Sequence, residues 1–286
     1  APGSKVLVVG NGGVQCLAAR LAAICGYETT LGVLGATSDV DEECIFDSKY
    51  PKGSLPLTLL PMVGDNVDVS TVERCILDAE GLIIAFDKDR VLPEASMNVF
   101  MPKPGEDKTA LKHVSVMSRY LNGKGMGFIA STAKAAGNVD VWDGNGKAVA
   151  AYKQMEATVK ERCAACGATW TIVRAGTLKG GASGAVKLDG GSGCADYLEP
   201  AFYKMGNQDL ANWRMLYDID AQGVVLEKGD GMAGPGFTAA LTATATEPGG
   251  GDSGRGGVAN ALVESLRVAA ADNADFSIGG AKAAAP

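Results

Sequence analysis

The sequence predicts an α/β fold built on a doubly wound, parallel β-sheet, and three observations lead to this prediction. An apolar run at residues 5–9 breaks at glycines and passes directly into a helical pattern at 16–24. Apolar runs of strand length then alternate with helical patterns along the chain. The run at 81–86 is apolar throughout, as expected of a parallel strand covered on both faces. Such alternation requires right-handed crossovers between parallel strands.

The expected elements follow from the spacing of apolar residues, which recur with a period of two in strands and a period of 3.6 in helices. Strands are expected at 5–9, 29–34, 57–62, 81–86, 127–130, 170–173 and 276–278. Helices are expected at 16–24 and at about 106–121, 148–165 and 258–270. A further helix is expected to begin at a cap, Ser70, and to carry Val72, Cys75, Ile76 and Ala79 on one face. The segment 87–104, which is punctuated by prolines, is expected to be a loop. Residues 1–178 are expected to form the core. Residues 179–286 are expected to form a glycine-rich, substrate- or partner-facing region plus the final helix and strand of the same domain.

Length, composition and charge narrow the class of protein. The 286 residues are 47% hydrophobic, which is ample for a buried core. A net charge of −7 and a pI near 4.9 argue against nucleic acid as a partner, because no dense Lys/Arg face is available for phosphates. No apolar stretch of membrane-spanning length occurs, although docking onto a membrane protein complex stays open.

The cysteines and the single histidine make redox and metal sites unexpected. Seven scattered cysteines suit reduced thiols. Cys163 and Cys166 spell C-x-x-C at the end of a helical pattern, where packing is favoured over a redox role. A single histidine and the lack of a second cysteine pair at zinc spacing argue against a metal site. The start at Ala1-Pro2 fits a mature protein after removal of a targeting peptide, or a trimmed chain.

The turn at residues 10–15 is typical of a dinucleotide site. Its sequence is Gly10, Asn11, Gly12, Gly13, Val14 and Gln15. Glycines let the backbone turn tightly and approach a pyrophosphate, and the helix that follows presents amide groups at its positive end. Gln15 stands where the third glycine of the motif is expected, and its amide would fill that space unless it turns outward or bonds the phosphate. The alternative is a glycine turn that only packs a strand on a helix.

Several segments together resemble the atypical short-chain dehydrogenase/reductases of the NmrA-like, NAD(P)-binding kind, including plastid and cyanobacterial members linked to photosynthesis. The most specific is the run Thr171-Ile172-Val173-Arg174-Ala175-Gly176, similar to the family's T-I-x-R-x-G. The other segments are the glycine turn at 10–15, Gly64-Asp65, Ala130-Ser131-Thr132, residues 152–156 and residues 253–259. The segment at 167–178, which contains the run at 171–176, and the segment at 253–259 differ in part from the family pattern.

The resemblance implies roles for individual residues. The pyrophosphate of NAD(P) would lie on the amides of the glycine turn, and Asp65 would meet the adenine. Ala85, at the end of the strand at 81–86, and Ser131 would line the cofactor site. The alternative for Asp65 is an aspartate in a surface turn, and the alternative for Ser131 is a hydroxyl that closes a turn. Arg174 is expected to anchor the chain by a buried ion pair or by carbonyl contacts.

Tyr152 is the candidate general acid of a reductase, because hydride delivery to a carbonyl leaves an oxyanion that needs a proton. Active members of the family carry a lysine four residues later, on the same helix face, but this chain has Glu156. Reversing a unit charge at about 5 Å costs roughly 6 kcal/mol, or some four pKa units. Tyr152 is therefore expected to be a packing residue, and Glu156→Lys to be needed for any catalytic role.

The cofactor type stays open. Neither a ribose-binding acid nor a basic residue for a 2′-phosphate follows the strand at 29–34, and the acidic residues Asp39, Asp41, Glu42 and Glu43 would repel NADP. NAD(P) binding is expected to be weak or absent.

Two functions remain. The first is a non-catalytic subunit or assembly factor of a larger, photosynthetic complex in the chloroplast stroma. The alternative is an NAD(P)H-dependent reductase of a small or isoprenoid-like substrate held by the glycine-rich region after Leu178.

Overall fold

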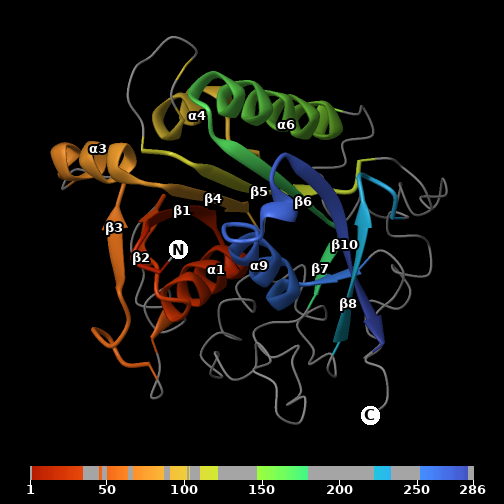
Figure 1. Ribbon diagram of the computed structural model, residues 1–286, viewed down its shortest axis with the longest axis horizontal. Coiled ribbons are helices and arrows are strands. Elements are labelled where there is room, and N and C mark those ends of the chain that lie inside the picture. Colours follow the sequence, from red (N-terminus) through yellow and green to blue (C-terminus); the bar gives the residue numbers. More distant parts are fainter. Residues whose placement is uncertain are drawn as a thin grey trace.

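The computed structural model describes residues 2–34, 45–46, 50–63, 67–86, 91–101, 103, 110–121, 147–179, 222–232 and 252–282. Its centre is an eight-stranded sheet with the order β3-β2-β1-β4-β5-β6-β10-β8 (Figure 1). The strands are β1 (Lys5–Asn11), β2 (Glu28–Val33), β3 (Leu57–Pro61), β4 (Gly81–Phe86), β5 (His113–Arg119), β6 (Thr169–Ala175), β8 (Gln222–Lys228) and β10 (Ala274–Lys282). Only β8 is antiparallel to its neighbour. A parallel pair, β7 (Thr177–Lys179) and β9 (Asp252–Gly254), lies apart from the large sheet.

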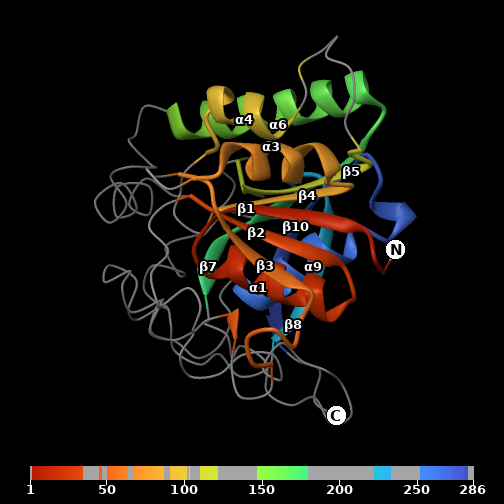
Figure 2. The same ribbon diagram turned by 90° about the vertical axis from the view of Figure 1, so that its left-hand side faces the viewer.

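Helices cover both faces of the large sheet (Figures 1 and 2). On one face lie α1 (Gly13–Ile24) and α9 (Arg255–Glu264), which pack on each other; on the other lie α3 (Val69–Asp78), α4 (Glu94–Phe100) and α6 (Lys147–Cys166). The short helix η3 (Ala269–Ala271) leads from α9 toward β10. The sheet is thus doubly wound and almost wholly parallel, as the sequence predicts.

The sheet separates two hydrophobic cores, and this explains the unbroken apolar run of β4. Ile83 packs in the core under α1 and α9, whereas its neighbour Ile84 packs in the core under α4 and α6. Both side chains are fully buried. Because successive side chains of a strand point to opposite faces, a strand with a core on each side can be apolar at every position.

The helix expected at about 106–121 is wrong, since this segment contains β5. All seven residues of β5 are buried, with His113, Ser115 and Met117 on the α9 side and Val114 and Val116 on the α6 side. The alternation of the segment has a period of two, and two-sided burial stabilises a strand where helix propensity is weak. The strand expected at 127–130 lies outside the described residues.

Smaller differences concern element ends and short elements. The cap of α3 is Asp68, which accepts from the Thr71 amide, and Ser70 lies inside the helix and donates to Asp68. The last helix begins and ends earlier than expected, at Arg255 and Glu264. The short helix α4 lies within the segment expected to be a loop, and β7, β8 and β9 were not expected at all. The remaining strands and helices lie where the sequence predicts them, and the domain boundary at 178 stays a prediction.

Candidate nucleotide site and a buried polar cluster

The glycine turn lies at the carboxyl end of β1, between β2 and β4, where the strand order of the sheet reverses. Such a reversal opens a crevice in which α/β proteins bind ligands. Gly10 has a φ of +146°, and a Cβ there would lie 1.6 Å from the carbonyl oxygen of Ala85. Gly12 has a φ of +90°. Both glycines are therefore required by the backbone of the turn itself.

Helix α1 begins at the turn without a side-chain cap. Its N-cap residue is Gly12, and its first turn contains no acidic residue. The positive end of a helix dipole stabilises an anion unless a carboxylate already occupies that end. The start of α1 can therefore hold a phosphate group.

Gln15 is held inside the protein and points neither outward nor toward a phosphate. Its side chain is buried, and its amide nitrogen donates to the carbonyl oxygen of Gly32 at 2.9 Å, with that of Val8 at 3.5 Å. The side chain thus lies between α1 and the strands β1 and β2. This corrects the expectation that its amide competes for the phosphate space, because the two strand carbonyls provide a partner within the sheet.

The other expected cofactor residues divide into two groups. Ala85 is fully buried on β4, directly opposite Gly10. Asn11 lies opposite Phe86 at the end of β1, and within the described part of the chain its Oδ1 atom is buried without a hydrogen-bond partner. Asp65 and Ser131 lie outside the described residues, as does the acidic run at 39–43, so their expected roles stay predictions.

A buried ion pair lies on the carboxyl half of β5 and β6, on the face of the sheet that α6 covers. The guanidinium of Arg174 on β6 donates to both carboxylate oxygens of Glu156 on α6, from Nε to Oε1 at 3.0 Å and from Nη2 to Oε2 at 2.8 Å. The hydroxyl of Ser118 on β5 donates to Glu156 Oε1 at 2.7 Å. All three side chains are more than nine-tenths buried. We call Ser118, Glu156 and Arg174 the Arg174 cluster.

Two further carboxylates border the Arg174 cluster. Asp275 on β10 accepts from Arg174 Nη1 at 2.5 Å, and Asp230, after β8, accepts from the Leu121 amide at 2.9 Å. Burial acts to lower the pKa of Arg174, but the hydrogen bonds and charges of Glu156 and Asp275 raise it overall. Burial raises the pKa of Asp230 above its ordinary value. Arg174 is therefore a permanent cation, as the expected buried ion pair requires.

Tyr152 lies one turn before Glu156 and is buried in the core under α6. The electrostatic argument about Tyr152 assumed a Glu156 charge without a partner, whereas Arg174 binds both oxygens of that carboxylate in the structure. Glu156, at the position where the resemblance implies a lysine, has both carboxylate oxygens bound, and Tyr152 is 3% exposed.

Sequence reasoning missed Ser118, Asp230 and Asp275. Ser118 was overlooked because its segment was expected to be a helix, although the alternation His113, Val114, Ser115, Val116 was the signal of a strand. The two aspartates carry no local signal, since they follow or begin strands far from α6 in the sequence.

Cys163 and Cys166 behave as packing residues. Both are free thiols, and Cys166 Sγ lies 3.6 Å from the carbonyl oxygen of Cys163. Burial raises the pKa of Cys163 to about 12, which keeps the thiol protonated and unreactive. Among the described residues, no three His, Cys, Asp or Glu side chains gather as metal ligands. No helix in the described ranges combines the length and apolar character needed to cross a membrane.

Comparison with known proteins supports the fold. No protein-family model and no curated protein matches the sequence. Among solved structures, the chain is similar to a wide-type short-chain dehydrogenase/reductase from Veillonella parvula in complex with NADP (TM-score 0.52, 13% identity, 96% of this chain and 94% of that one). It is also similar to a protein from Lactobacillus casei (TM-score 0.51, 11% identity, 97% and 100%) and a candidate epimerase from Bacteroides thetaiotaomicron (TM-score 0.50, 12% identity, 99% and 99%).

These likenesses and the sheet topology define the class of fold. It is the Rossmann-like α/β fold found in short-chain dehydrogenase/reductases and in epimerase-like proteins. Fold by itself does not establish activity, so function depends on the site residues.

Proposed function

We propose that this chain binds NAD(P) at the glycine turn without catalysing reduction, and that it works as a subunit or assembly factor of a larger complex. One observation carries the non-catalytic part of this proposal: Glu156 replaces the expected lysine and is bound on both oxygens by Arg174. A reductase needs a proton donor at the nascent oxyanion. Neither the buried Tyr152 nor the neutralised Glu156 supplies one.

The residues of the turn fit a dinucleotide. The start of α1 suits the pyrophosphate, and the buried Oδ1 of Asn11 suits a hydrogen-bond donor such as a ribose hydroxyl. The Veillonella protein of similar fold is described in complex with NADP. When bound, NAD(P)H would supply a hydride. Affinity on the order of micromolar or weaker is expected, because the acidic run at 39–43 follows β2 and repels phosphate.

The proposed complex is photosynthetic and located in the chloroplast stroma, where the chain can dock on a membrane protein complex. This assignment rests on the family resemblance. A protein partner is supported by the edge strand β8, where Val224 and Leu226 on one face and Val225 on the other are 46–58% exposed. An edge strand with exposed apolar side chains presents unpaired backbone groups to which another chain can pair.

Calorimetry and a NADPH oxidation assay test the nucleotide and catalytic parts. Asn11→Asp places a carboxylate beside the pyrophosphate and is expected to weaken NAD(P) binding about tenfold. Asn273→Asp makes the same change in an exposed turn directly before β10, at the amino edge of the sheet, and is expected to leave NAD(P) binding unchanged. Equal affinities in the two variants would contradict the site. Carbonyl-dependent NADPH oxidation that disappears in Tyr152→Phe would establish the reductase alternative instead.

The size of the native assembly tests the complex. We expect the protein in a native extract to migrate well above its own mass of 29.2 kDa. Val225→Lys is expected to release it, whereas Lys52→Val, on an exposed turn, is not. Migration of the native protein as a free monomer would contradict the proposal.

A further inference from the structure

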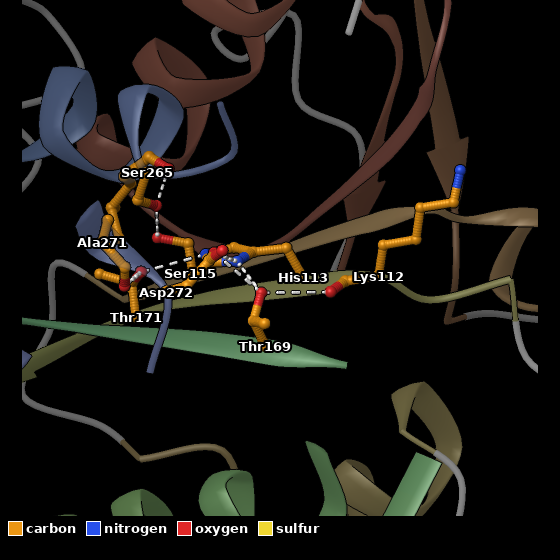
Figure 3. Close-up of polar contacts among 9 residues, drawn as sticks. Lys112, His113, Ser115, Thr169, Thr171, Ser265, Ala271 and Asp272 are labelled. Carbon is orange, nitrogen blue, oxygen red and sulfur yellow. Dashed lines mark hydrogen bonds and ion pairs between the residues drawn. The ribbon is translucent and has the colours of Figure 1, made fainter. Parts of the chain in front are cut away.

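The single histidine of the chain, His113, lies at the amino edge of the sheet, far from the glycine turn along the strands. It is the first residue of β5, and 6% of it is exposed. Figure 3 shows its ring between Thr169 and Thr171 of β6, beside Ala271 and Asp272 at the end of η3. Ser115, on the same face of β5, is bonded to Ser265 after α9. A polar layer therefore joins β5 and β6 to the connection between α9 and β10.

The hydrogen on Nε2 of His113 is fixed by its neighbour. Thr171 Oγ1 lies 2.7 Å from the carbonyl oxygen of Ala271, which can only accept, so the one hydroxyl hydrogen of Thr171 points there. Toward Nε2, at 3.1 Å, the same hydroxyl can then only accept. The Nε2 atom carries a hydrogen in both the neutral and the charged ring.

The Nδ1 atom has no such restriction, because Thr169 can serve either charge state. Thr169 Oγ1 lies 2.6 Å from Nδ1, 3.0 Å from Asp272 Oδ1 and 3.3 Å from the carbonyl oxygen of Lys112. Beside a neutral ring, the Thr169 hydrogen points to Nδ1. When Nδ1 gains a proton it donates to Thr169, whose hydrogen then turns to Asp272. The same positions of the heavy atoms accommodate both states.

In the described part of the chain, Asp272 is the charged side chain that faces the ring, with Oδ1 3.3 Å from Nδ1, and its carboxylate is 43% exposed and reaches solvent. The ammonium of Lys112 pairs with Glu80 and points away from the ring (Figure 3). The β6 neighbours are uncharged hydroxyls. Burial lowers the pKa of His113, while the charge and hydrogen bond of Asp272 act in the opposite direction.

We propose that His113, Thr169, Thr171 and Asp272 form a proton-responsive clasp, the His113 clasp, between the β5–β6 pair and the segment leading into β10. At neutral pH the ring is uncharged with its hydrogen on Nε2, and Thr169 donates to it. In acid a proton from solvent binds Nδ1, Thr169 reverses its hydrogen bond, and Asp272 becomes the counter-ion. The bond from Thr171 to Ala271 holds in both states, but the buried ring carries a charge in acid, so acid loosens the clasp.

Long-range ¹H–¹⁵N NMR of the full chain tests the clasp, because a single histidine gives a single pair of ring nitrogens. We expect the neutral ring to carry its hydrogen on Nε2 and to titrate below the ordinary value of about 6.5. Asp272→Asn removes the facing charge and is expected to lower the pKa further, by at least about half a unit. Asp78→Asn removes an exposed carboxylate paired with Lys5 and should leave the pKa unchanged.

A second readout follows the hydrogen itself. Thr171→Val removes the acceptor at Nε2 and is expected to give a mixture of the two neutral tautomers. Protection factors of the Ala271 and Asp272 amides should fall between pH 7 and pH 5 in the native chain, because the exposed ring of the open state binds the proton more readily than the buried ring does. They should fall further in Asp272→Asn. A native ring with its hydrogen on Nδ1, or equal pKa values in Asp272→Asn and Asp78→Asn, would overturn the proposal even if Thr171→Val fails to fold.

Discussion

The Arg174 cluster and the His113 clasp are built on the same two strands, yet they lie on opposite faces and at opposite ends of them. At the carboxyl half of β5 and β6, a guanidinium and a carboxylate are locked together under α6. At the amino edge, a neutral ring is held among hydroxyls under α9. The first cluster has a fixed charge and the second has a charge that depends on pH. One strand pair thus provides a permanent anchor and a titratable contact, because alternate side chains reach different surroundings.

The largest effect is expected from Glu156→Lys. This substitution places a second cation against Arg174 in a buried site, so the free energy of unfolding should fall by about 3–5 kcal/mol. Glu161→Lys makes the same change at an exposed position of α6 and should cost well under 1 kcal/mol. Chemical denaturation of both variants measures the difference. A stable Glu156→Lys protein that reduces carbonyl substrates would restore the original expectation about this position.

Ser118→Ala should have the next largest effect. Its hydroxyl donates to the ionised Glu156 in a fully buried position, and hydrogen bonds to charged groups contribute about 1.5–3 kcal/mol. Arg174 still binds both carboxylate oxygens in this variant, so the protein should fold. Denaturant midpoints at constant slope check the value. A cost below about 0.5 kcal/mol would mean that Arg174 alone satisfies Glu156.

Ser115→Ala provides the matched change on the opposite face of the same strand. Its partner is the hydroxyl of Ser265, which also bonds the carbonyl oxygen of Leu262. A neutral hydrogen bond contributes about 1 kcal/mol, and Ser265 keeps a partner after the substitution. The expected cost is therefore at most about 1 kcal/mol. A larger loss than that of Ser118→Ala would reverse the order of the two faces.

The smallest effect should come from pH. The pKa of His113 is lowered in the folded protein, so the unfolded chain binds more protons between that pKa and about 6.5. The free energy of unfolding should therefore fall as the pH drops through this window, and level off below the folded pKa. The effect is small because burial and Asp272 oppose each other. Denaturation curves of native protein and His113→Gln between pH 7.5 and 5 check this, and parallel curves would contradict it.

The local sequence pattern predicted an element correctly where burial or backbone geometry alone decided its structure. The unbroken apolar run of β4 and the glycines at 10–13 predicted a two-faced parallel strand and a tight strand-to-helix turn, and both are present. The local pattern gave the wrong prediction at β5. Its seven residues mix polar and apolar side chains and are compatible with a helix, and burial between two cores selects the strand. Helix α4 was missed for a related reason, since its seven residues form a short helix within a Pro-punctuated segment.

The candidate site divides in the same way. Sequence indicated that Glu156 stands where a lysine is expected and that Arg174 forms a buried anchor. It did not indicate that these two residues are each other's partner, because α6 and β6 approach only after the crossover is packed. The same limit explains Gln15, whose amide finds a carbonyl of β2 that is seventeen residues away along the chain.

The sequence by itself determined the alternation of strands and helices around a parallel sheet, the glycine turn and the absence of a lysine after Tyr152, because these depend on residue type and near-neighbour spacing. Only the tertiary structure decided how the charges are used. It paired Glu156 with Arg174, turned Gln15 into the sheet and placed His113 between two threonines and Asp272. A charge or hydrogen-bond donor acquires its partner from whatever the fold brings within about 3 Å, and no local pattern encodes that distance.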